Sequence, residues 1–132
     1  RKRFLAAEKG LVPWVNLMGI VAAEAAYRDG DEWVRQLLEY LQGNRDCLID
    51  FLRNELPEIK VASPEGTYLA WLDCQNAQID GSPYQFFLEK AHIAFNDGAT
   101  FGKGYEKFVR LNFGCSRNQL IEVLERMKQS WA

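Results

Sequence analysis

The segment Phe108–Phe113 alternates, with an unbroken apolar set on one side and an aromatic ring, a guanidinium and an amide on the other. Val109, Leu111 and Phe113 fall on one side of the alternation, and Arg110 occupies the middle of the other side. A period of two residues predicts a β-strand with one buried face. This segment constrains the fold most, because one face of the strand must close a core while the opposite face presents a guanidinium at mid-strand.

Arg110 is the strongest candidate for a functional side chain. A guanidinium stays charged at any accessible pH, and its planar fork of donors matches a carboxylate or a phosphate. We therefore hypothesise that Arg110 binds an anionic group of a ligand. The structural alternative is that Arg110 pairs with a neighbouring Asp or Glu or lies on the solvent face, and from the strand alone this alternative is favoured.

Size and charge narrow the class of protein. The chain has 132 residues and a net charge of −2, which suits one domain without the basic patch of a nucleic-acid binder. We see no secretory signal and no apolar run of the roughly 18 residues that a membrane helix needs. The three cysteines are widely spaced, so we expect free thiols in a cytoplasmic protein, with neither a disulfide framework nor a metal site.

The chain is expected to contain a helical part, residues 1–56, and an α+β part, residues 57–132. The sequence begins at Arg1 inside an expected helix, which suggests a fragment of a longer protein. The middle helix is apolar on nearly all sides, so we expect part of its covering surface to lie outside the chain. The helices of the first part are predicted at residues 1–10 (ending at Gly10), 14–27 (Pro13 in its first turn) and 31–56 (capped by Asp31).

The second part is predicted to form a small, largely antiparallel sheet with helices packed on it, which is the α+β class. The strand over 67–73 is apolar on both faces, so we expect it in the middle of the sheet. Ser82 and Ser116 are the expected caps of the two helices, and Asn96-Asp97-Gly98 is an expected turn. The predicted strands are 59–62, 67–73, 93–95 and 108–113, and the predicted helices are 83–91 and 117–131.

Catalytic groups are hard to find. The glycine-rich connector Gly98–Gly104 lacks the spacing of a phosphate-binding loop. It could close over a ligand, although a plain connector is favoured on its residues alone. His92 is the only histidine, and no nucleophile or acid pair can be assembled around it. We therefore predict no catalytic residue and no metal ligand in this chain.

Four segments together resemble a known family. They are Gly19–Tyr27, Pro64–Asp73, Asn96–Gly102 and Phe108–Gly114. In this order and spacing they are similar to the C-terminal small domain of class I/II pyridoxal-phosphate-dependent aminotransferases of fold type I. The nearest subgroup is the cystathionine β-lyase (C–S lyase) branch. In that family the arginine matching Arg110 binds the α-carboxylate of the substrate.

The resemblance implies more than the residues do. The helix over 31–56 would join the large and small domains. The full-length enzyme would use pyridoxal phosphate and an amino-acid substrate and would form a homodimer. The cofactor-binding domain has no counterpart here, so this chain should neither hold the cofactor nor turn over substrate. The residues alone leave open another class, a stand-alone α+β domain that senses a small carboxylate, and they do not separate transamination from C–S cleavage.

Overall fold

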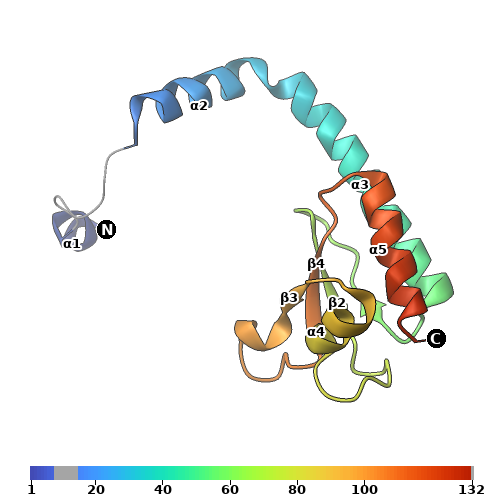
Figure 1. Cartoon of the computed structure of the whole chain (residues 1–132). Coiled ribbons are helices and arrows are strands. Elements are labelled where there is room, and N and C mark those ends of the chain that lie inside the picture. Colours follow the sequence, from blue (N-terminus) through green and yellow to red (C-terminus); the bar gives the residue numbers. More distant parts are fainter. Residues whose placement is uncertain (8–14, 132) are drawn as a thin grey trace. The chain divides into compact units, whose positions relative to one another are not determined.

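The computed structural model describes residues 1–7 and 15–131 (Figure 1). The chain divides into two compact units, Arg1–Leu37 and Leu38–Ala132. The domain boundary expected from the sequence, between residues 56 and 57, stays a prediction. The expected end of the first helix at Gly10, and the expected positions of Pro13 and Trp14, lie outside the described residues.

The first unit contains α1 (Lys2–Ala7), α2 (Leu17–Asp29) and the beginning of α3 (Asp31–Glu55). Helix α2 begins later than the expected residue 14, because Asn16 caps it. The Asn16 side chain accepts a hydrogen bond from the backbone N–H of Gly19 at 2.7 Å, which satisfies a donor that the helix itself cannot. No residue of α2 is buried, and Leu17 and Met18 are 73% and 75% exposed. Helix α2 therefore adds nothing to the core of the described chain.

The second unit is built on a four-stranded antiparallel sheet with the strand order β1-β2-β4-β3. This architecture confirms the predicted α+β class, and β2 lies inside the sheet as expected. The strands are β1 (Lys60–Val61), β2 (Leu69–Asp73), β3 (Asn96–Asp97) and β4 (Phe108–Asn112).

Helices α3 and α5 (Arg117–Gln129) lie beside each other in this unit (Figure 1). The Tyr40 hydroxyl of α3 accepts a hydrogen bond from the N–H of Arg117 at 2.7 Å. Ser116 caps α5 as predicted, accepting from the Gln119 N–H at 3.3 Å. The core between the helices and the sheet holds fully buried side chains from each layer, among them Leu48, Leu52, Leu72, Val109, Leu120 and Leu124.

Between β2 and β4 the prediction is partly wrong. The expected helix over 83–91 consists of α4 (Pro83–Phe86) and a π-helical turn (Phe87–Ala91), and the Ser82 side chain makes no capping hydrogen bond. The expected strand over 93–95 is absent, because Ile93 and Phe95 alternate into the core without ladder partners. The strand lies instead at Asn96–Asp97, where a turn was expected. The turn follows one step later, as the 3₁₀ helix Gly98–Phe101.

Asn44 links α3 to the end of β4. Its side chain is fully buried, and its Nδ2 donates to the carbonyl oxygens of Phe113 and Cys115, both at 2.9 Å. In the sequence this residue interrupts the apolar seam of the helix. In the fold it supplies two donors to carbonyls that lie beyond the last ladder residue of β4.

Asn44→Ala should lower the free energy of unfolding by about 2–4 kcal/mol, since a buried carbonyl and a partly buried carbonyl both lose their donor. The measurement is urea denaturation followed by tryptophan fluorescence. Asn54→Ala, on an exposed position of the same helix, is the matched control and should change stability by less than about 0.5 kcal/mol. Equal stabilities for the two variants would contradict this role.

Candidate functional site

Three side chains form a row across one face of the sheet. Arg110 of β4 lies directly opposite Trp71 of β2 and directly opposite Asn96 of β3. Residues in direct register share a face of the sheet. The opposite face carries Val109 and Leu111, which are 0% and 2% exposed. The alternation predicted for this strand is therefore confirmed, with Arg110 half-buried on the face away from the core.

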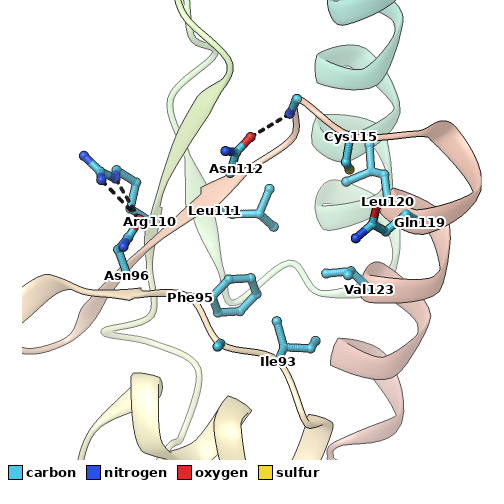
Figure 2. A pocket seen from close by; sticks show the side chains of 12 residues that line it. Ile93, Phe95, Asn96, Arg110, Leu111, Asn112, Cys115, Gln119, Leu120 and Val123 are labelled. Carbon is cyan, nitrogen blue, oxygen red and sulfur yellow. Dashed lines mark hydrogen bonds between the residues drawn. The ribbon is translucent and has the colours of Figure 1, made fainter.

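The Arg110 guanidinium is held at one edge by a neutral amide. Its Nε and Nη2 both donate to Asn96 Oδ1, at 3.2 and 3.1 Å. Figure 2 shows this pair turned away from Leu111 and Phe95, which point to the other side of β4. The guanidinium carbon lies 4.7 Å from the centre of the Phe101 ring, within the range of a cation–π contact. Asn96 and Phe101 thus contact the same cation on two sides.

No carboxylate pairs with Arg110 among residues 1–7 and 15–131. The ion pairs in that part of the chain involve other cations, such as Arg126 with Glu122 and Lys128 with Glu55. Nη1 of Arg110 makes no hydrogen bond there either. The side chain of the neighbouring acid, Asp97, accepts a hydrogen bond from the Ala99 N–H at 3.0 Å. The structural alternative of an Asp or Glu partner is thus not found in the described chain, and the role of Arg110 in binding a ligand stays a prediction.

Four aromatic side chains gather beside Arg110: Trp71, Phe101, Tyr105 and Phe108, here called the aromatic cluster. Trp71 stacks on Phe108 with centroids 5.7 Å apart, and its other ring contacts are edge-on, with Phe101 at 5.1 Å and Tyr105 at 5.6 Å. Phe101 and Tyr105 come from the segment between β3 and β4. The segment that contains the glycine-rich connector therefore folds back over the face of the sheet that carries Arg110.

Sequence reasoning identified Arg110 but missed Asn96, Phe101 and Trp71. The contacts of these residues depend on strand register, and no local pattern specifies which residue of β2 or β3 faces Arg110. The placement of two aromatic residues within or next to a glycine-rich connector was the one available signal.

Gly98 fixes the start of the connector. A Cβ at this position would lie 2.2 Å from the Tyr105 carbonyl oxygen and 2.4 Å from the Phe108 carbonyl oxygen. Neither oxygen can move without displacing backbone. Further along, Gly102 and Gly104 have φ of 130° and 97°, in the region that favours glycine. The composition of the connector thus follows from its path over the sheet.

Gly98→Ala should destabilise the fold by about 2–3 kcal/mol or more, because a methyl group cannot fit between two backbone carbonyls. Gly66→Ala is the matched control, since a Cβ there would meet nothing within 4 Å, and it should stay within about 1 kcal/mol of the parent. Thermal and urea unfolding of both variants measure the difference. A Gly98→Ala protein as stable as Gly66→Ala would show that the close approach does not exist in solution.

A cavity of about 300 Å³ lies between β4, the segment 93–96 and α5 (Figure 2). Its walls include apolar side chains such as Leu111, Leu120 and Val123, and among the residues that the structure describes Arg110 is the one charged residue that lines it. Figure 2 shows the Arg110 guanidinium turned away from those side chains. Among the described residues, the cavity therefore brings no second charged side chain to the candidate site, and its other ionisable group is the Cys115 thiol.

Two of the thiols, Cys74 and Cys115, are not set up for nucleophilic chemistry. Burial, reinforced by the negative charge of Asp73, raises the pKa of Cys74 from 9.0 to about 12. Burial also raises the pKa of Cys115. His92 is exposed. In the part of the chain that the structure describes, no group of three or more metal-ligating side chains forms, and no helix has the length and apolar content to cross a membrane.

The pKa of Cys74 predicts a loss of stability at high pH. Above about pH 9 the unfolded chain releases the thiol proton while the folded chain keeps it, so the free energy of unfolding falls as pH rises towards 12. Between pH 8 and 10 the parent should lose about 1–2 kcal/mol relative to Cys74→Ala in urea denaturation. Cys47→Ala, which leaves Cys74 in place, should show the same decrease in the free energy of unfolding as the parent. Parallel pH profiles for the parent and Cys74→Ala would refute this cause.

Comparison with known proteins places this geometry in a family. Cystathionine β-lyase of Corynebacterium glutamicum is 39% identical over 115 residues, covering 86% of this chain and 30% of that protein. Cystathionine β-lyase PatB of Bacillus subtilis is 36% identical with the same coverage. The chain is homologous to the C-terminal part of cystathionine β-lyases and pyridoxal-phosphate-dependent aminotransferases. No family model matches it.

Solved structures of these pyridoxal-phosphate enzymes share the fold. The pyridoxal-phosphate-bound C–S lyase of Staphylococcus hominis superimposes with a TM-score of 0.85 at 30% identity, over 98% of this chain and 35% of that one. Cystalysin of Treponema denticola, which contains pyridoxal phosphate, gives a TM-score of 0.86 at 28% identity over 95% of this chain and 32% of its own. The chain thus spans about a third of the length of the relatives it matches. The resemblance and the small-domain fold predicted from the sequence are confirmed.

Proposed function

We propose that this chain supplies the substrate-binding arginine of a pyridoxal-phosphate-dependent aminotransferase or C–S lyase that acts on amino acids. One observation carries the proposal. Arg110 presents its guanidinium on the face of the sheet away from the core, where a neutral amide holds it and where no carboxylate of the described chain neutralises it. The homology supports the proposal, because each relative named above is a cystathionine β-lyase, a C–S lyase or cystalysin.

The proposed role of Arg110 is to orient the substrate. Its planar fork can bind both oxygens of an α-carboxylate with charge-assisted hydrogen bonds, each contributing about 1.5–3 kcal/mol. Hydrogen bonds to both carboxylate oxygens fix the direction of the substrate's Cα bonds relative to the rest of the active site. Binding of this kind lowers KM and raises kcat/KM without any proton transfer by the arginine itself.

The chain's own residues do not fit the cofactor. Lys107 Nζ donates to the carbonyls of Ile79 and Gly81, at 2.9 and 2.8 Å. Lys103, within the connector, is exposed, and the Glu106 carboxylate accepts hydrogen bonds from the N–H of the adjacent Gly104. Pyridoxal phosphate would serve as the electron sink of the reaction, and a separate domain would hold it. We therefore propose that this chain alone is not catalytic.

The remaining parts of the proposal concern assembly. The partner of this chain would be the cofactor-binding domain, with α3 as the connecting helix, in a cytoplasmic homodimer. The exposed apolar side chains of α2, such as Leu17 and Met18, support a partner surface on that helix.

In the complete enzyme, Arg110→Ala should lower kcat/KM for amino-acid substrates by about 10- to 100-fold, since the substrate carboxylate loses its charged partner. Arg110→Lys should recover part of the loss, because it keeps the charge without the fork. Steady-state kinetics measure both variants. Arg126→Ala, on the exposed side of α5, is the control and should behave as the parent. Unchanged kinetics in Arg110→Ala would rule out the proposed role.

A further inference from the structure

We infer that Asn96 and Phe101 are positioning residues that orient the Arg110 guanidinium before a carboxylate ligand arrives. This inference rests on the proposed function for the identity of the ligand. The ligand class is a compact carboxylate, such as the acid end of an amino acid, approaching the edge of the guanidinium that Asn96 leaves open.

The first argument is geometric. An arginine side chain has many rotamers, and ordering them opposes binding. Here Nε and Nη2 converge on the single oxygen Oδ1 of Asn96, at 3.2 and 3.1 Å. Two donors on one acceptor define both the direction and the plane of the fork. Because Asn96 lies in direct register with Arg110, the sheet itself fixes the acceptor.

The second argument is electrostatic. The acceptor is a neutral amide, so it holds the fork without cancelling its charge. A carboxylate at this position would form an ion pair and compete with the ligand. The acid that follows, Asp97, lies opposite Val109, and its side chain accepts a hydrogen bond from the Ala99 N–H. The site therefore keeps a positive charge available on a side chain that is already oriented.

The third argument concerns the face of the guanidinium. The centre of the Phe101 ring lies 4.7 Å from the guanidinium carbon, and the Phe101 and Trp71 rings form a T-shaped pair with centroids 5.1 Å apart. Trp71 in turn lies opposite Arg110 in β2. The connector thus supports one face of the cation through a ring that is itself supported by the sheet. The open Nη1 edge is left for the ligand.

A first experiment observes the positioning directly in the 132-residue chain. The Arg110 Nε–H proton, assigned by NMR, should exchange slowly with water because Asn96 accepts it. Asn96→Ala should accelerate this exchange about tenfold or more, and Asn96→Asp, which keeps an acceptor oxygen, should restore slow exchange. Phe101→Leu should remove the ring-current shift of that proton. Asn112→Ala is the control, since Asn112 bonds the Gly114 N–H instead, and it should leave both signals unchanged.

A second experiment measures the consequence in the complete enzyme. Asn96→Ala and Phe101→Leu should raise KM by about three- to tenfold while kcat stays within about twofold, since the arginine remains present but is less ordered. Asn96→Asp should raise KM further, although it restores the slow proton exchange. A structural defect would instead lower the fraction of active enzyme and reduce kcat.

The outcomes separate the two proposals. If Arg110→Ala impairs catalysis while Asn96→Ala and Phe101→Leu behave as the parent, the positioning inference alone is wrong. Parent-like KM in Asn96→Asp would likewise overturn it, because an added charge beside the fork would then be without effect. If Arg110→Ala leaves the kinetics unchanged, the proposed function is wrong and the positioning role falls with it.

Discussion

Strand β4 joins the core to the candidate site, because its successive side chains point in opposite directions. Val109 and Leu111 close the hydrophobic core, and Arg110 between them faces the other way. A slip of one residue in the pairing would bury the guanidinium and expose the two apolar side chains. The hydrophobic effect that stabilises the sheet therefore also holds the arginine on the face away from the core.

The helical layer sets where this strand ends. Asn44 of α3 donates to the carbonyls of Phe113 and Cys115, and the Ser116 cap of α5 follows at once. A buried amide linking a helix to irregular backbone costs more to lose than a surface contact, because its partners cannot turn to water. The far end of the candidate site is thus tied to the longest helix of the unit, whereas its other end depends on the glycine-rich connector.

Local patterns carried most of the fold prediction and little of the site prediction. The period of two in β4, the apolar repeat of α3 and the Ser116 cap each depend on neighbouring residues, so a single sequence sufficed to predict them. The strand Asn96–Asp97 was missed because Ile93 and Phe95 mimic a strand while packing into the core. The pairing of Asn96 with Arg110 and the fold-back of Phe101 depend on register and on loop path, which no short-range pattern encodes. Arg110 was proposed because a guanidinium in the middle of an alternating strand is chemically conspicuous, whereas its contacts with Asn96 and Phe101 involve residues that no local pattern links to it, and its role stays a prediction.

The crowding at Gly98 has a practical consequence for redesign. The connector is clamped at its root by the Tyr105 and Phe108 carbonyls, whereas Ala99 and Thr100 at its tip are exposed. The Ala99 side chain can therefore be varied at little cost, whereas the Thr100 hydroxyl donates to the Asp97 carbonyl oxygen at 2.6 Å and holds the turn before Phe101. Redesign beside Arg110 can therefore begin at the exposed Ala99 while the crowded position of Gly98 is kept unchanged.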